Sequence, residues 1–278
     1  MSLTYTCENH VIEIALEKLK DAGLVSQDAY FNYDAPQNLR KEVAYRDYDF
    51  LSRLSRTAEV ETVRSILTWL KQKGIVSQDA TYDERAFDEL RREIKARFII
   101  PSSSITPVME RLLYALSSLR RPRRIIGLGT YCGNAFAWIV GSGCGPGKVY
   151  QAEKAYGIDI NVDASERARE NLGTLAHTDH VELIAEDART AVERLEGKFD
   201  CVYLDVGDKD IGKDLYRELI ERLYEKVEVG GWVLAHDTVV PPFAGQLEQY
   251  LAFVRDGQHF GESISLDVDP FGLELSIK

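Results

Sequence analysis

The fold is decided by residues 124–133, which read RIIGLGTYCG. The apolar run at 124–128 predicts a short buried strand, and the pattern at 134–140 predicts a helix directly after the turn. Glycines at such a turn let a ligand approach the backbone, where the start of the helix presents free N–H groups. The third glycine comes one residue later than in the dinucleotide fingerprint GxGxxG. The turn alone is weak evidence for a nucleotide-like ligand, because tight packing of a strand on a helix also requires glycine.

Strands and helices alternate through the rest of the chain. Further short apolar strands are predicted at 155–160, 181–185, 199–204 and 232–235. Helices are predicted between and after them, at 164–172, 190–195, 214–227 and 244–254. This alternation predicts a parallel sheet that is covered on both faces and binds ligands at the carboxyl ends of its strands.

The chain closes with a pair of strands. Residues 263–268 and 273–277 predict two strands separated by a four-residue connection that reads DPFG. A connection this short makes the two strands antiparallel. The expected fold is therefore an α/β, Rossmann-like sheet that is parallel except for a closing antiparallel hairpin.

The first hundred residues predict helices rather than strands. Apolar spacing indicates three helices, at 11–22, 60–73 and 84–97. The first two stop at Gly23 and Gly74, and the sequence around the first stop, LKDAGLVSQDA, returns at the second as LKQKGIVSQDA. Two copies are too few for a solenoid. We expect residues 1–100 to form a helical cap that controls substrate access or makes a homodimer, and residues 101–278 to form the main domain.

Composition narrows the class of protein. The 278 residues carry a net charge of −11, which would repel a nucleic acid, and no apolar run approaches the ~18–20 residues of a membrane span. Four widely spaced cysteines and a polar N-terminus without a signal-peptide pattern indicate a reducing, cytoplasmic location. The one dense basic cluster, RRPRR at 120–124, is interpreted as the solvated turn before a strand rather than a nucleic-acid contact.

Acidic residues end two further strands of the predicted sheet. Asp159 follows the second strand, where a carboxylate can accept hydrogen bonds from both hydroxyls of a ribose. Asp187, followed by Ala188, comes at the end of the third strand, where it can accept from an adenine amino group. Each acid alone is more often a helix cap or a surface charge. Together with the glycine turn they predict a ligand that contains adenosine.

At these residues the chain resembles the S-adenosylmethionine-dependent O-methyltransferases of the catechol and caffeoyl-coenzyme A type, which are class I methyltransferases. The resemblance covers 107–278. It is densest in LGTYCG at 128–133, Leu204-Asp205, the glycine turn at 230–231, AHDTV at 235–239 and GLEL at 272–275. It implies a seven-stranded sheet of order 3-2-1-4-5-7-6 whose last strand is antiparallel, and S-adenosylmethionine as the cofactor.

The resemblance also implies the residues that bind the cofactor. They are Gly127, Gly129, Thr130, Tyr131, Gly133, Asp159, Ile160, Asp187, Ala188 and Asp205. Gly129 and Gly133 would cradle the methionine part of the cofactor. Gly127 departs from the family, which has an acid at this position, and the departure leaves open how the methionine amino group is held.

The metal-dependent branch of the family holds a divalent cation on acids after strands four and five. The matching residues are Asp205, His236 and Asp237, which could bind Mg²⁺, Mn²⁺, Fe²⁺ or Zn²⁺ and lower the pKa of a coordinated hydroxyl. The alternative is that the His-Asp pair only ends its strand. At the position of the family's general-base lysine this chain has Asp208, and Lys209 is the next residue. Both are therefore candidate catalytic residues. The alternative for Lys209 is a solvated surface charge without a catalytic role.

We expect a methyltransferase that acts on an oxygen atom of a small molecule, and whether a divalent metal assists it is left open. The first alternative is a metal-independent N- or C-methyltransferase. A nicotinamide-dependent oxidoreductase is disfavoured by the late third glycine. A non-catalytic adenosine-binding module is supported only by the missing acid at Gly127.

Overall fold

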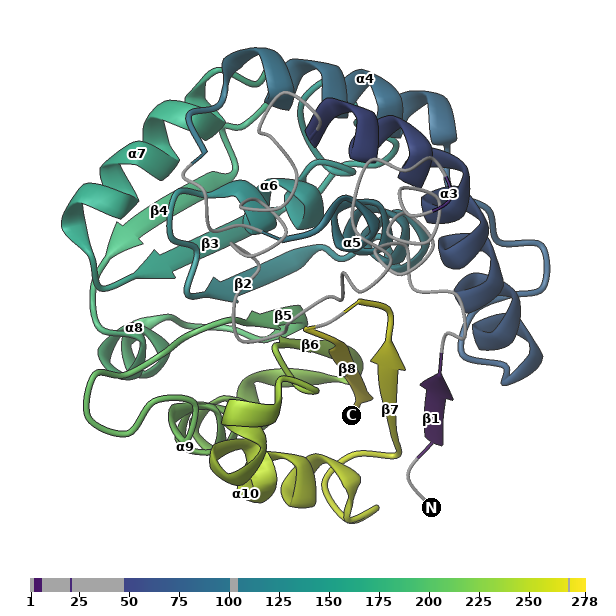
Figure 1. Cartoon of the computed structure of the whole chain (residues 1–278). Helices are drawn as coiled ribbons and strands as arrows, with labels where there is room; N and C mark the ends of the chain where they lie inside the picture. The colour runs from purple at the N-terminus through teal and green to yellow at the C-terminus, as the bar shows by residue number, and fades with distance from the viewer. Residues whose placement is uncertain (1–2, 7–20, 22–47, 101–104, 270) are drawn as a thin grey trace.

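The computed structural model describes residues 3–6, 21, 48–100, 105–269 and 271–278. In these residues eight strands form one sheet, with the order β1-β7-β8-β6-β5-β2-β3-β4 (Figure 1). The strands are β1 Leu3–Thr6, β2 Arg124–Leu128, β3 Lys154–Asp159, β4 Val181–Ala185, β5 Phe199–Leu204, β6 Val227–His236, β7 Glu262–Asp267 and β8 Leu273–Ile277.

The seven strands from β2 to β8 have the expected order and directions. Neighbouring strands from β4 to β6 are parallel, whereas β8 is antiparallel to both β6 and β7. When β1 is left out and β2 to β8 are counted as strands 1 to 7, the order from β4 to β7 is 3-2-1-4-5-7-6. The prediction of this Rossmann-like sheet is therefore confirmed. Because the strands from β2 to β6 all run the same way, their carboxyl ends meet along one edge of the sheet.

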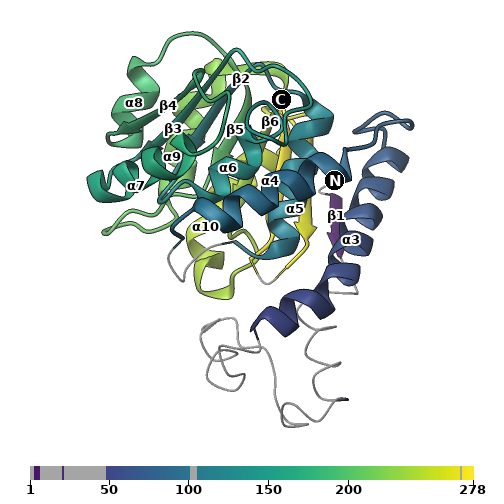
Figure 2. The ribbon, with the colours of Figure 1, turned by 90° about the horizontal axis from the view of Figure 1, so that it is seen from above.

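Helices cover both faces of the sheet (Figures 1 and 2). On one face lie α3 Tyr48–Gln72, α4 Glu84–Arg97, α5 Pro107–Arg120, α6 Asn134–Val140 and α7 Val162–Gly173. On the other lie α8 Ala188–Arg194, α9 Leu215–Leu223 and α10 Ala244–Arg255, with short 3-10 turns at Tyr224–Lys226 and Pro241–Phe243. Each face has its own apolar core. None of the helices in the described residues combines the length and apolar character needed to span a bilayer.

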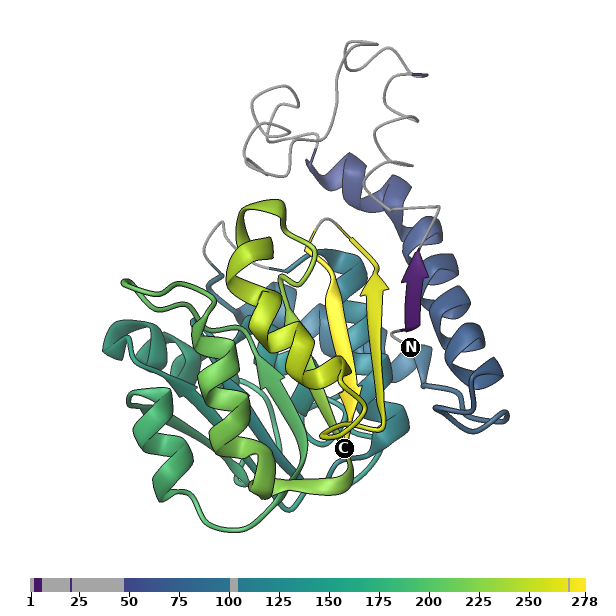
Figure 3. The same cartoon turned by 90° about the horizontal axis from the view of Figure 1, so that it is seen from below.

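One strand was not expected. β1 pairs in parallel with β7, Leu3 opposite Ile264, and lies at the edge of the sheet beside α3 (Figure 3). The expectation that the first hundred residues are purely helical is therefore wrong here. The physical reason is that β7 leaves one row of backbone groups unpaired, and a segment of Leu, Thr and Tyr readily adds to such a row.

One long helix was also missed. Thr106 is the N-cap of α5, and its side chain accepts a hydrogen bond from the backbone N–H of Met109. Pro107 follows at the first helical position. Ten of its fourteen residues are buried. Its polar residues recur at helical spacing on one side, but that side is buried as well, where Arg111 binds Glu59 of α3 and Ser117 donates to the carbonyl of Ile139 in α6.

The helices before residue 100 belong to the same apolar core as the sheet. The Phe87 ring of α4 packs against Tyr114 of α5 and Trp138 of α6, with ring centroids 5.4 and 5.5 Å apart. α3 begins earlier than the predicted residue 60 and ends as expected, two residues before Gly74, whose φ is +74°. The predicted helix at 11–22 and its repeat lie outside the described residues, apart from Asp21. The division at residue 100 stays a prediction.

The expected glycine turn at 230–231 is wrong. β6 continues through both residues with a wide bulge, because Val227 pairs with Phe199 while Trp232 pairs with Cys201. The bulge turns Val229 outward, and 84% of this residue is exposed. Gly230, with φ +76°, supplies the left-handed conformation that the bulge requires.

A buried ionic cluster joins α3, α4 and α5. Glu59 is bonded to Arg111 and lies 2.9 Å from Arg91, which also lies 3.4 Å from Glu110. One carboxylate oxygen of Glu110 is buried without a hydrogen-bond partner among the described residues. Burial raises the pKa of Glu110 from its ordinary 4.5 to about 7, in spite of Arg91.

Glu110 therefore makes stability fall with rising pH. The folded protein holds this proton more tightly than the unfolded chain, so the contribution is complete below about pH 4.5 and is lost by about pH 7. We expect Glu110→Gln to raise the free energy of unfolding at about pH 8 by up to about 3 kcal/mol and to change it little at about pH 4.5. Urea unfolding at both pH values measures this. A glutamine variant that keeps the wild-type pH profile would contradict it.

Candidate active site

The glycine turn after β2 lies against the backbone at the end of β5. Gly129 has φ +83°, and a Cβ built on it would lie 2.5 Å from the carbonyl carbon of Asp205 and closer still to its oxygen. Gly133, with φ +84°, allows α7 to pack closely, since its Cβ would lie 3.1 Å from that of Ala168. The buried Thr130 lies between them. Both glycines are thus required by packing, whether or not a ligand is bound.

Asp159 is held in place by the backbone of two loops. One carboxylate oxygen accepts from the N–H of Tyr131 at 2.7 Å, and the other accepts from the N–H of Asn161 at 2.9 Å. A carboxylate can accept about four hydrogen bonds. Each oxygen therefore keeps capacity for one further donor. Tyr131 and Ile160, on either side of this carboxylate, are 44% and 68% exposed.

Phe136 explains the departure at Gly127. Its ring lies 2.6 Å from the position that a Cβ on Gly127 would occupy, and 2.9 Å from that of a Cβ on Gly157. An acid at residue 127 has no room while this ring is in place. The methionine amino group must therefore be held by other residues.

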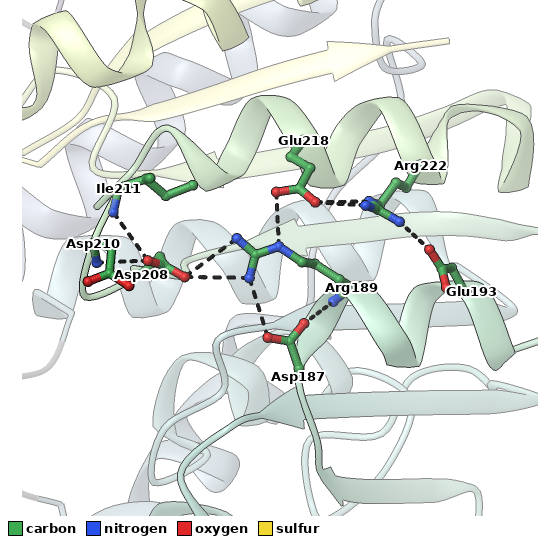
Figure 4. A network of polar contacts seen from close by, with 8 residues as sticks. All are labelled: Asp187, Arg189, Glu193, Asp208, Asp210, Ile211, Glu218 and Arg222. Carbon is green, nitrogen blue, oxygen red and sulfur yellow. Dashed lines mark hydrogen bonds and ion pairs between the residues drawn. The ribbon is translucent and has the colours of Figure 1, made fainter.

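Asp187 belongs to a network of polar contacts that is centred on Arg189 and reaches across the sheet edge (Figure 4). Asp187 caps α8 by accepting from the Arg189 N–H at 2.7 Å. The Arg189 guanidinium lies 3.3 Å from Asp187, 3.4 Å from Asp208 and 2.9 Å from Glu218 of α9. Glu218 also binds Arg222, which pairs with Glu193. Arg189 thereby ties the end of β4 to the loop after β5.

Asp208 and Lys209, the two candidates for the general base, have different surroundings in the structure. Asp208 accepts from the N–H groups of Asp210 and Ile211, and these bonds lower the pKa of Asp208. With Arg189 on its other oxygen, Asp208 anchors the loop. Lys209 is exposed, and its ammonium makes no hydrogen bond or ion pair with another described residue. A catalytic role for either residue stays a prediction, and these contacts argue against it.

Asp205, His236 and Asp237 converge, as their positions on neighbouring strands predict. Their ligand atoms lie within 4.8 Å of one another. The imidazole Nδ1 of His236 is 3.4 Å from Asp205 and 3.3 Å from Asp237. Burial alone would lower the pKa of His236, but the two carboxylates raise it to about 9. Burial alone would raise the pKa of Asp205, but His236 and Lys213 hold it well below its usual range.

Lys213 is the site residue that sequence reasoning missed. Its ammonium lies 3.1 Å from Asp205 and 2.8 Å from Asp237. Burial alone would lower the pKa of Lys213, but the same two carboxylates raise it. It follows Asp205 by eight residues, whereas Asp208, the position matched to the family's general-base lysine, follows it by three. The loop between Asp205 and Lys213 returns the lysine to the carboxylate. The one signal in the sequence was a lysine at the start of the helix after strand four.

These contacts test whether the residues fit a divalent cation. Two carboxylates and an imidazole are suitable donors. However, the Lys213 ammonium already bridges one oxygen of each carboxylate. The cluster as it lies here does not fit a divalent ion. Metal binding at Asp205, His236 and Asp237 stays an untested prediction.

The fold is that of class I methyltransferases, and solved structures share it. The S-adenosylhomocysteine-bound methyltransferase of Podospora anserina is 17% identical, with TM-score 0.55 over 78% of this chain and 96% of its own. The O-methyltransferase of Bacillus cereus in complex with S-adenosylhomocysteine is 14% identical, with TM-score 0.52 over 79% and 100%. The Streptomyces achromogenes O-methyltransferase involved in tomaymycin synthesis is 18% identical, with TM-score 0.52 over 77% and 95%. At these identities the likeness shows the fold alone.

The sequence itself matches a family model. Residues 126–238, from β2 to the cluster after β6, match the family described as "Methyltransferase domain". Among curated proteins the sequence has no match. Residues 126–238 thus match a methyltransferase domain, and the sheet that contains them has the strand order of that fold.

Proposed function

We propose that the protein transfers a methyl group from S-adenosylmethionine to an oxygen atom of a small molecule. The observation that carries this is the single edge where the cofactor residues after β2, β3 and β4 meet the charged cluster after β5 and β6. A cofactor bound along the first three loops would present its methyl group toward that cluster. A small molecule is expected as the acceptor, while a homodimer and a cytoplasmic location remain predictions.

The residues at the carboxyl ends of β2, β3 and β4 suit the ribose, adenine and methionine parts of S-adenosylmethionine. Asp159 keeps one acceptor position on each oxygen for the two ribose hydroxyls. Ile160 offers an exposed apolar surface for the adenine ring, and Asp187 with Ala188 lies on the adenine side. Gly129, Thr130, Tyr131 and Gly133 would surround the methionine part.

The charged cluster fits attack by an oxygen atom. In the reaction the hydroxyl proton passes to solvent water, the acceptor oxygen forms a bond to the methyl carbon, and the carbon–sulfur bond breaks with its electron pair left on sulfur. The positive charges of Lys213 and protonated His236 would stabilise the oxyanion that attacks. The carboxylates of Asp205 and Asp237 hold these two groups in position.

Calorimetric titration tests the cofactor, and a transfer assay tests the acceptor atom. We expect S-adenosylhomocysteine to bind and NADH not to bind. With labelled S-adenosylmethionine, a panel of matched phenols and anilines should be methylated on oxygen. Binding of NADH alone would favour the oxidoreductase alternative. Methylation of the anilines alone would show that the acceptor atom is nitrogen.

A further inference from the structure

We infer that Lys213 is an internal cation that takes the place of a divalent metal between Asp205 and Asp237. The site would then operate with a positive charge supplied by the chain itself. The catalytic meaning of this inference rests on the proposed function. Its structural content concerns the cluster alone and can be tested without turnover.

The first argument is the hydrogen bonding of the ammonium group. A lysine ammonium has three N–H donors and no acceptor. In Lys213 they face three oxygens, of Asp205 at 3.1 Å, of Asp237 at 2.8 Å and of the Tyr216 hydroxyl at 3.0 Å. All three donors are therefore used, and two of the three oxygens belong to the residues that a metal would need.

The second argument is the electrostatics of the two carboxylates. Asp205 and Asp237 both lie against one buried position, and two negative charges there repel each other unless a cation lies between them. The Lys213 ammonium bridges them directly. A second cation that bridged the same oxygens would have to displace the ammonium, since the two positive charges cannot share the position.

The third argument is that Lys213 cannot easily leave. Its residue is only 7% exposed. Its backbone N–H donates to the Gln246 side chain of α10 at 2.7 Å, and Gly212 before it lies against the same amide. The ammonium lies 5.0 Å from the ring centre of Tyr216 and 5.6 Å from that of Phe243, which adds favourable cation–π contacts. The Tyr216 hydroxyl is itself bonded to the carbonyl of His236.

Removal of this ammonium should create the metal site that the wild type lacks. The experiment is a Mn²⁺ titration followed by electron paramagnetic resonance on the wild type, Lys213→Met and Lys209→Met. Methionine keeps the length of the side chain without its charge, and Lys209 is an exposed lysine of the same loop. We expect Lys213→Met to bind Mn²⁺ at least about tenfold more tightly than the wild type, and Lys209→Met to match the wild type.

Tight Mn²⁺ binding by the wild type, with no gain in Lys213→Met, would overturn the inference. If Lys213→Met does not fold, the wild type still decides: micromolar Mn²⁺ binding, or a melting temperature lowered by a chelator, would show a resident metal. Titration of the same wild-type sample with S-adenosylhomocysteine keeps the two proposals apart. Failure to bind this ligand would refute the proposed function and leave the Mn²⁺ result standing.

Discussion

Gly129→Ala is expected to lower the free energy of unfolding by more than about 3 kcal/mol and to abolish S-adenosylhomocysteine binding. Two costs combine. The residue has φ +83°, which an alanine adopts only with strain, and the new Cβ would lie 2.5 Å from the carbonyl carbon of Asp205 and 2.9 Å from the backbone nitrogen of Val206. These are backbone atoms, so relief requires the loop after β5 to move.

Gly173→Ala is the matched control for this variant. Gly173 ends α7, and nothing lies within 4 Å of the Cβ that it would gain. Alanine there should be neutral or slightly stabilising, because it restricts the unfolded chain. Urea unfolding of both variants measures the difference. Equal free energies of unfolding for the two variants would show that the turn at Gly129 accommodates a Cβ without strain.

The second large effect is expected at Asp159. Asp159→Ala should weaken S-adenosylhomocysteine binding by about 2–4 kcal/mol, roughly 30- to 1,000-fold, because two hydrogen bonds to a charged group are lost. The structure adds a second cost, since the N–H groups of Tyr131 and Asn161 also lose their acceptor. The loop should become less stable even without ligand.

Glu166→Ala separates the ribose contact from a general charge effect. Glu166 is an exposed acid on α7, the helix that follows Asp159. Calorimetry should show wild-type affinity for Glu166→Ala and greatly reduced affinity for Asp159→Ala. Undiminished binding by a folded Asp159→Ala protein would remove this residue from the cofactor site.

The parts of the fold that follow from local pattern were predictable. Short apolar runs between turn residues gave β2, β4, β5 and β8 with the bounds that the structure shows. α5 and β1 were both missed. α5 is buried on every side, so its polar residues do not mark a solvent-facing side, and β1 alternates apolar and polar residues over four positions only.

The site was predictable only where strand ends determine it. Asp205 and Asp237 were found through the family resemblance, and their convergence was predictable because they end neighbouring parallel strands. Lys213 was missed because its position depends on the loop after β5, which is held through Asp208 by Arg189 of α8 and through the Lys213 backbone by Gln246 of α10. No spacing rule connects residues that meet only through such contacts.

Phe136 has a consequence for the evolutionary history of this pocket. Its ring requires glycine at residue 127, where a Cβ would lie 2.6 Å from it, while at residue 157 it obstructs a Cβ together with the side chain of Leu183. An ancestor with an acid at 127 could not have carried this ring in the same rotamer, and a descendant cannot regain the acid in one step. Residue 136 must first become smaller. Residues 127 and 136 should therefore vary together among relatives, with the change at residue 136 preceding the return of an acid at residue 127.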